Sequence, residues 1–403
     1  MVTNLYLHIP FCRRRCAYCS FVSVVVDKIP EEAYRQALER EFRQRKAAWP
    51  ELGRPLETVY FGGGTPSLLA PEFYARFLDF LAAETGLAAG AEITLEANPI
   101  DLDREKITAY RAAGINRLSL GIQTFSDLGL NRLGRAHDAA GARAAIMAAR
   151  RAGIDNLSLD LICAWPGQDR ACLEEDLARV VAFSPEHLSV YLLTLEPDTP
   201  MGRQAARGEL DLIDESGQAG MLELVAESLE DAGYLHYEVS NFARDPNFRS
   251  RHNLAGWRLA DYLGLGAGAC GSRRCRFGEE HWAERYTNLA APGKYIELVG
   301  NGVSDSPAAP AGQVPVAPGF SWSETEIIDR KTSFNEALML GLRLRAGVEL
   351  EALQQEYGAE PVAAMLDKAR PLVEAGLLED SGGRLRISRR AVWLGDEITV
   401  ALF

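Results

Sequence analysis

Short apolar runs rich in β-branched residues alternate with longer amphipathic stretches through the first half of the chain. Strands followed by helical stretches indicate βαβ units and a parallel sheet. Glycines in AAGIN (112–116) and RAGID (151–155) predict helix ends just before a strand. The pattern predicts an α/β fold, an incomplete parallel (β/α)6 barrel, with a doubly wound open sheet as the alternative. The predicted strands are NLYLHIP (4–10), TVYFGGG (58–64), EITLEAN (92–98), RLSLGIQ (117–123), NLSLDLI (156–162) and HLSVYLL (187–193).

The periodic pattern changes after the sixth strand, which predicts four parts of the chain. Residues 1–235 form the partial barrel, and 236–302 form an extension that packs on it. Residues 303–324 are rich in Pro, Ala and Gly, which predicts a linker or loop. In residues 325–403 helical stretches precede a hairpin and a last helix, an order that predicts a small winged-helix-like domain. This last part has few basic residues, so packing or covering a substrate is favoured over DNA binding.

Composition and charge narrow the class of protein. The 403 residues are 47% hydrophobic and 25% charged, a balance typical of globular proteins. The net charge of −13 argues against nucleic acid as a partner, because phosphate neutralisation needs a basic face. No apolar run is long enough to cross a bilayer, and no signal-peptide pattern is present, which predicts a cytoplasmic protein and leaves a peripheral membrane contact open. Seven cysteines in a reducing compartment indicate metal binding, catalysis or burial rather than disulfides.

Three of the cysteines, Cys12, Cys16 and Cys19, follow the first predicted strand in HIPFCRRRCAYCSF (8–21). Thiolates bind soft metals, and three of them can hold three corners of a [4Fe–4S] cluster while the fourth iron stays open to another ligand. Aromatic neighbours such as Tyr18 could shield a cluster from water. The alternatives are a zinc knuckle completed by His8 and a redox-active C-x-x-C pair.

The spacing C-x3-C-x2-C, with an aromatic residue before the last cysteine, resembles the radical S-adenosylmethionine (SAM) superfamily. The resemblance implies that the open iron is chelated by the amino and carboxyl groups of S-adenosylmethionine. It also implies that electron transfer through the cluster cleaves a carbon–sulfur bond and gives a 5′-deoxyadenosyl radical.

Further motifs resemble the coproporphyrinogen-oxidase-like subfamily over nearly the whole chain. In FGGGTPS (61–67) the glycines allow close backbone approach, and their bare N–H groups are expected to pair with the methionine part of the cofactor. The carboxylates of Glu96 and Asp160 suit hydrogen bonds with the ribose hydroxyls or the amino group of the cofactor, and Arg135 suits an ion pair with its carboxylate. The alternative for each polar residue is a structural hydrogen bond inside the barrel. The resemblance implies cofactor contacts from Tyr6, Tyr18, Gly63, Gly64, Thr65, Glu96, Gln123, Arg135 and Asp160.

Two branches of this subfamily compete, and a radical methyltransferase of similar architecture is a third reading. Oxygen-independent coproporphyrinogen III oxidases carry a further cysteine two residues after the third cluster ligand, where this chain has Phe21. They also have more residues ahead of the motif than the eleven before Cys12. HYEVSNFAR (236–244) and RHNLAGWRLADYLGLGAGACGS (251–272) resemble the HemW-like heme chaperones instead. We therefore expect heme binding and delivery to a heme-accepting protein, without coproporphyrinogen oxidase activity; whether the chain is otherwise an enzyme stays open.

Two departures from the heme-chaperone pattern lie in the second of these stretches. Gly256 stands where a tyrosine is expected, and Cys270 stands where a histidine is expected. His252 and Cys270 are the candidate ligands for heme iron, since imidazole and soft donors are usual choices.

The run of arginines from Arg13 to Arg15 lies between the first two cluster cysteines. It predicts either a solvated loop or a positive collar that attracts an acidic reductant of the flavodoxin type. A monomer and a dimer formed on cluster assembly are both compatible with the sequence.

Overall fold

The computed structural model describes residues 2–49, 52–277, 281–300 and 320–403. Twelve strands form one mixed sheet in the order β14-β13-β12-β11-β1-β4-β5-β6-β7-β8-β10-β9. All six predicted strands are present, and each pairs in parallel with the next, which confirms the parallel core. They are β1 (Asn4–Ile9), β4 (Leu56–Gly63), β5 (Leu87–Ala97), β6 (Arg117–Gln123), β7 (Leu157–Cys163) and β8 (His187–Leu192).

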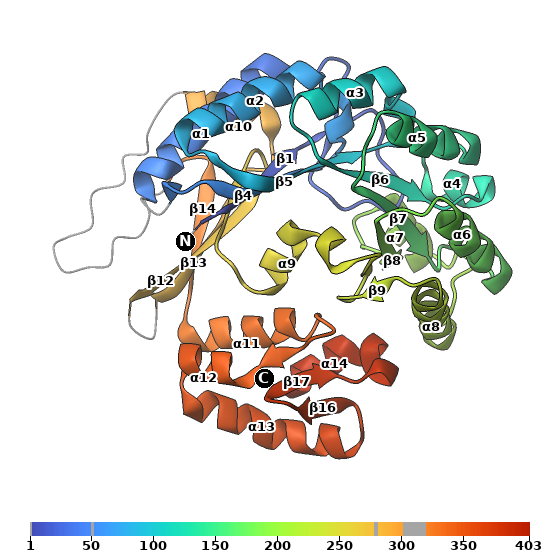
Figure 1. Cartoon of the computed structure of the whole chain (residues 1–403), viewed down its shortest axis with the longest axis vertical. Coiled ribbons are helices and arrows are strands. Elements are labelled where there is room, and N and C mark those ends of the chain that lie inside the picture. The colour runs from blue at the N-terminus through green and yellow to red at the C-terminus, as the bar shows by residue number, and fades with distance from the viewer. Residues whose placement is uncertain (1, 50–51, 278–280, 301–319) are drawn as a thin grey trace.

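The helices between the parallel strands cover the outer side of this curved sheet (Figure 1), as in the predicted α/β fold. Gly114 and Gly153 adopt positive φ angles of 108° and 76° just after helices, as the predicted helix ends require. The outer helices are α1 (Glu31–Ala48), α2 (Pro71–Glu84), α3 (Arg104–Ala112), α4 (Asp127–Leu133), α5 (Ala139–Arg151), α6 (Arg170–Ala182) and α8 (Glu215–Asp231).

The two faces of the parallel strands differ in polarity. In β6, Leu118 and Leu120 belong to the buried core beneath the helices, whereas Arg117 and Ser119 point to the inner side and line a cavity. Strands alternate the direction of successive side chains, so each strand contributes one apolar and one polar row. The helices therefore cover the apolar face, and the polar face is left for a site.

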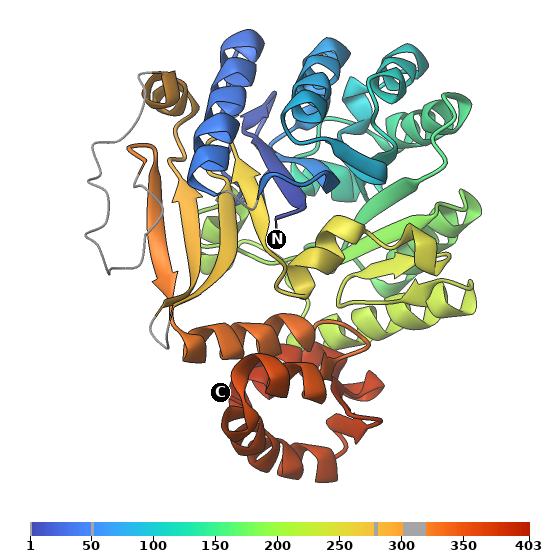
Figure 2. The ribbon, with the colours of Figure 1, turned by 60° about the vertical axis from the view of Figure 1, so that its left-hand side comes forward.

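Residues after β8 extend the sheet at both edges. β9 (Leu235–His236) and β10 (Asn241–Ala243) continue beyond β8, and β11 (Tyr262–Leu265) pairs in parallel with β1. Both views place α9 (Arg251–Trp257) on the inner side of the sheet, opposite the outer helices (Figure 2). The remaining elements of this part are β12 (Cys270–Phe277), β13 (His281–Asn288), α10 (Pro292–Gly300) and β14 (Ser323–Ile328).

The C-terminal residues form a smaller unit with its own hydrophobic core. Its strands pair in the order β15-β17-β16, and helices precede the β16–β17 hairpin as the sequence predicts. The four domain limits remain predictions: β14 crosses the predicted limit at 325 while pairing with β13, and 303–319 of the predicted linker lie outside the described residues. The elements are α11 (Arg330–Gly341), β15 (Val348–Glu349), α12 (Leu350–Tyr357), α13 (Ala359–Glu374), β16 (Leu378–Ser381), β17 (Arg384–Ile387) and α14 (Gly395–Ala401).

Short elements complete the described chain, and none of its helices is both long and apolar enough to cross a membrane. The short elements are β2 (Phe11–Cys12), β3 (Val24–Val25), α7 (Pro200–Ala206) and the 3-10 turns η2 (Pro66–Leu68), η3 (Pro99–Asp101), η4 (Pro246–Phe248) and η5 (Arg389–Leu394).

Candidate functional site

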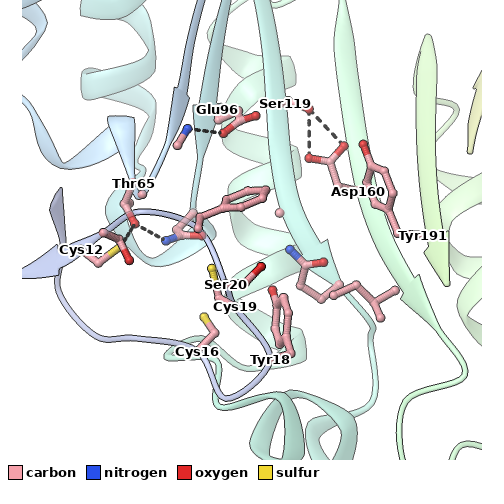
Figure 3. Close-up of a pocket in the computed structure, with 18 of the residues that line it drawn as sticks. Cys12, Cys16, Tyr18, Cys19, Ser20, Thr65, Glu96, Ser119, Asp160 and Tyr191 are labelled. Atoms are coloured by element: carbon pink, nitrogen blue, oxygen red, sulfur yellow. Dashed lines mark hydrogen bonds between the residues drawn. The ribbon is translucent and has the colours of Figure 1, made fainter. Parts of the chain in front are cut away.

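The loop that follows β1 carries the three cysteines of the motif to the carboxyl end of the parallel strands. Pairing of β2 with β3 closes the loop at its base. The backbone N–H of Ala17 donates to the Leu133 carbonyl, 3.1 Å away, and ties the loop to the end of α4. Cys12, Cys16 and Cys19 all line one end of a cavity of about 390 Å³ (Figure 3).

Two of the three thiols have hydrogen-bond donors beside their sulfur atoms. Arg135 Nη1 lies 3.4 Å from Cys16 Sγ, and the Thr65 hydroxyl donates to Cys12 Sγ at 3.5 Å. Such donors stabilise thiolate sulfur and influence the reduction potential of a cluster. Burial raises the pKa of the Cys12 thiol, so metal binding has to displace its proton.

His8, the fourth ligand of the zinc alternative, is engaged in structural hydrogen bonds. Its Nε2 atom lies 2.7 Å from the Val22 carbonyl oxygen, and its Nδ1 atom lies 3.1 Å from the Tyr6 hydroxyl. The ring therefore links β1 to the far end of the cysteine loop. This arrangement disfavours a zinc knuckle completed by His8.

The glycines after β4 approach the loop closely, but their N–H groups are not bare. A Cβ atom on Gly64 would lie 3.0 Å from Cys12 Sγ, so only glycine leaves room for the loop there. The Gly64 N–H donates to the Ile9 carbonyl at 2.8 Å, and the Gly63 N–H donates to Glu96 Oε2 at 3.1 Å. The neighbouring strands β1 and β5 thus accept hydrogen bonds from both N–H groups in this structure, and contact of the two glycines with the cofactor stays a prediction.

Glu96 projects from β5 into the cavity beside the glycines. Its carboxylate accepts hydrogen bonds from the Tyr60 hydroxyl at 2.8 Å and from the Gly63 N–H. Burial, together with the charge of nearby Asp160, raises the pKa of Glu96 to about 7, despite these hydrogen bonds. A cationic group in the cavity would therefore find a carboxyl group that is half ionised near neutral pH.

Asp160 lies on β7, across the cavity from the cysteines (Figure 3). Its carboxylate accepts hydrogen bonds from the Ser119 hydroxyl at 2.9 Å and the Ser158 hydroxyl at 3.1 Å. Burial raises the pKa of this carboxyl group as well. The serines hold the carboxylate in one orientation at the wall of the cavity.

Gln123 reaches the cavity from the end of β6, and Arg135 reaches it from the turn after α4. Arg135 Nη2 donates to the Gly121 carbonyl at 2.9 Å and also contacts Asn98 Oδ1. Gln123 has a φ of 69°, and the pairing of β6 with β7 shifts register between Gly121 and Gln123. A left-handed residue other than glycine costs free energy, and such residues cluster at functional sites.

The two predicted tyrosines occupy different positions. Tyr18 lines the cavity, and burial raises the pKa of its hydroxyl. Tyr6 lies one layer deeper, outside the set of described residues that line the cavity, with its ring stacked on Tyr60 at 6.0 Å. Tyr6 therefore supports Tyr60, which forms the wall in its place.

Neither heme candidate is among the described residues that line this cavity. His252 Nδ1 is 2.9 Å from the Thr58 hydroxyl, and its ring stacks on Tyr60 at 5.0 Å. Burial lowers the pKa of His252 to about 4. Cys270 Sγ lies on β12, 3.2 Å from the Thr287 hydroxyl. Their role toward heme stays a prediction.

The three arginines of the cysteine loop are not equivalent. Arg13 Nε lies 2.8 Å from Asp101, whose side chain is 1% exposed, so this ion pair anchors the loop. Arg14 and Arg15 line the mouth of the cavity instead. A positive collar of the kind that the sequence predicts would therefore consist of two side chains rather than three.

Several cavity residues were missed by the motif-based reading of the sequence. All of them except Glu196 and Asn253 share one signal, which is a polar side chain at alternate positions of a predicted strand. The missed residues are Tyr60, Asn98, Arg117, Ser119, Ser189, Tyr191, Glu196 and Asn253.

Comparisons with known proteins extend these observations. Residues 6–180 match the family model of the Radical SAM superfamily, and residues 328–394 match that of the HemN C-terminal domain. The protein named Heme chaperone HemW from Bacillus subtilis is 33% identical, over 98% of this chain and 97% of the relative. The Heme chaperone HemW from Lactococcus lactis is 32% identical, over 98% of this chain and 96% of the relative.

A solved structure shares the fold along nearly the whole chain. It is the coproporphyrinogen III oxidase (HemN) from Escherichia coli, described as a radical SAM enzyme, with a TM-score of 0.77 and 23% sequence identity. The match covers 99% of this chain and 89% of that chain. Identity this low supports a common architecture and says nothing of the reaction.

Proposed function

This chain belongs to the radical SAM superfamily and, within it, to the HemW family, and from that premise we propose that it is a heme chaperone that binds heme and delivers it to an acceptor protein. One observation carries the proposal: proteins named heme chaperones match the chain from end to end, including the part that follows the radical SAM region. The three thiols at the mouth of a polar cavity support the cofactor part of it. We place this activity in the cytoplasm.

In this proposal Cys12, Cys16 and Cys19 hold a [4Fe–4S] cluster, and the cavity beyond them holds S-adenosylmethionine. The two groups together supply one-electron chemistry when bound. The Glu96 carboxylate accepts hydrogen bonds from the ammonium group of the cofactor, and the Asp160 carboxylate accepts hydrogen bonds from its ribose hydroxyls. The other proposed contacts are Tyr18, Gly63, Gly64, Thr65, Gln123 and Arg135, with Tyr6 acting through Tyr60.

Heme transfer is the direct test of the proposed function. The reconstituted protein is expected to bind heme, seen as a shifted Soret band, and to pass it to apomyoglobin under anaerobic conditions. The same preparation, given reductant, S-adenosylmethionine and coproporphyrinogen III, is expected to yield no protoporphyrinogen IX by HPLC. Failure to bind heme, or clear formation of the porphyrinogen product, would contradict the proposal.

An acidic electron donor of the flavodoxin type is the proposed reductant. Replacing both Arg14 and Arg15 with glutamine is expected to slow reduction of the cluster by flavodoxin about tenfold at low salt, because the loss of two charges weakens electrostatic steering. The difference is expected to shrink as salt screens the attraction. Stopped-flow absorbance at two ionic strengths measures it.

Two further variants give the control for the arginine experiment. Arg370→Gln removes an exposed charge in the C-terminal unit, and reduction is expected to proceed as in the wild type. Arg13→Gln is expected to lower thermal stability, because it leaves the buried carboxylate of Asp101 without its cation. A defect in the Arg14/Arg15 variant that does not depend on salt would indicate a damaged loop and would count against docking.

A further inference from the structure

A second cavity, of about 240 Å³, lies between the large sheet and the C-terminal unit. We call it the interdomain cavity. One side is formed by β8, α8 and β10, and the other side is formed by the turn after α11, by η5 and by the start of α14. Its lining residues include Val225, Phe242, Trp393, Glu230 and the arginines Arg343, Arg345 and Arg389.

The interdomain cavity combines apolar walls with arginine side chains. Apolar side chains line the cavity from both sides, such as Val225 on α8, Phe242 on β10 and Trp393 of the C-terminal unit, while Glu230 and His236 add polar groups to the same lining. Pockets of this kind bury the apolar body of a ligand, while a few polar groups fix its orientation. The walls therefore suit a flat, apolar ligand with a polar edge.

Arg345 is the cation available to such a polar edge. Its backbone is fixed, because its N–H donates to the Tyr237 carbonyl at 3.1 Å and the preceding Leu344 bridges to Glu238. Its guanidinium group has no hydrogen-bond or ion-pair partner within the described part of the chain. Burial lowers the pKa of this arginine, and the charge of Glu230, which also lines the cavity, opposes that shift.

The two other arginines of the cavity are already paired. Arg343 Nη2 lies 2.7 Å from Asp396 Oδ1, and Arg389 is paired with Glu230. A partly buried cation without a partner is costly, and an anionic ligand would relieve that cost. The arrangement marks Arg345 as the group that a carboxylate would contact.

Strand β8 separates the interdomain cavity from the cavity beside the cysteines. Tyr191 lines the cysteine cavity, Val190 lines the interdomain cavity, and Leu192 lines both. A ligand in the interdomain cavity would therefore lie against the strand that also forms a wall of the proposed cofactor site.

We propose that the interdomain cavity binds the propionate-bearing edge of heme, with one propionate on Arg345 and the edge of the macrocycle between α8 and Trp393. This inference rests on the proposed function, because it takes heme as the ligand and names where the heme lies. A cavity of about 240 Å³ accommodates only part of a molecule as large as heme. The rest of the macrocycle stays accessible, as transfer to an acceptor requires.

The experiment compares heme with heme dimethyl ester, in which both propionates are blocked. Arg345→Gln is expected to weaken heme binding about tenfold, because the charge-assisted hydrogen bonds between the guanidinium group and one propionate are lost. Binding of the ester is expected to stay unchanged. Arg370→Gln, an exposed arginine of the same unit, is expected to change neither. Titrations followed at the Soret band give all of these affinities.

A second substitution fills the interdomain cavity without removing a charge. Ala226→Phe, on the partly exposed side of α8, is expected to weaken binding of both heme and its ester, because it occupies the space of the macrocycle. Thermal unfolding identifies any variant that fails to fold.

The outcomes separate this inference from the proposed function. If the wild type binds no heme, the proposed function fails. If the wild type binds heme, and binding is unaffected by Arg345→Gln and Ala226→Phe but weakened by His252→Ala or Cys270→Ala, heme lies on the inner side of the large sheet. In that case the interdomain site is wrong while the chaperone function stands. Equal loss of heme and ester in Arg345→Gln would also overturn the proposed propionate contact.

Discussion

Replacing Cys12, Cys16 and Cys19 together with alanine is expected to reduce bound iron from about four atoms per chain to background after anaerobic reconstitution. The three thiols share one end of a cavity, and two of them contact hydrogen-bond donors suited to thiolate sulfur. Without them the loop offers no soft ligand to iron. Iron analysis and the EPR spectrum of the reduced protein measure the loss.

Cysteines elsewhere in the chain provide the matched control. Cys163 is buried at the end of β7, and Cys172 lies on α6; neither lines the cavity beside the motif. The variants Cys163→Ala and Cys172→Ala are expected to keep both the iron and the spectrum. In the wild type, S-adenosylmethionine is expected to change that spectrum. Iron and a spectrum retained in the triple variant would show that the cluster is bound elsewhere or is absent.

Glu96→Gln is expected to weaken binding of S-adenosylmethionine to the reconstituted protein by about tenfold or more at pH 8, as for a lost charge-assisted hydrogen bond. The cofactor brings an ammonium group, and Glu96 is the carboxyl group next to the glycines. Isothermal titration measures this affinity without any turnover. An exposed glutamate on α3, changed in Glu105→Gln, serves as the control and is expected to bind normally.

The pKa of Glu96 gives the same residue a pH signature. With a pKa of about 7, the carboxyl group is mostly ionised at pH 8 and mostly protonated at pH 6. A cation binds the ionised form, so wild-type affinity is expected to fall about tenfold from pH 8 to pH 6. Glu96→Gln is expected to lose this dependence. A fall of the same size in both proteins would assign the pH effect to another group.

Protein stability distinguishes a lost contact from a damaged fold. The pKa of Glu96 is raised from 4.5 in the unfolded chain to about 7 in the folded protein, so the folded state binds the proton more tightly between these values. Proton binding by Glu96 therefore contributes to the free energy of unfolding at low pH, and this contribution is lost as the pH rises from 4.5 to about 7. Glutamine stays neutral, so Glu96→Gln is expected to be at least as stable as the wild type at pH 8.

Much of the fold was predictable from local patterns. The period of two along the strands and the glycines after α3 and α5 depend only on neighbouring residues, and all six predicted strands were confirmed. The cysteine spacing likewise lies within one loop, and the structure brings the three thiols to one cavity. In the structure Glu96, Gln123 and Asp160 line the cavity together from three neighbouring strands.

The tertiary structure decided which groups remain available, because hydrogen-bond partners come from segments distant in the sequence. The Gly63 N–H donates to Glu96, and the Arg13 guanidinium pairs with Asp101, so both groups have partners within the protein that their sequence context did not indicate. Arg345 shows the reverse: nothing in its neighbourhood along the chain distinguishes it from Arg343, which is paired. Only the packing of the C-terminal unit against β8 and α8 leaves that one cation beside an apolar cavity. Short-range sequence patterns determine elements and their faces, whereas the pairing of charges depends on which faces meet.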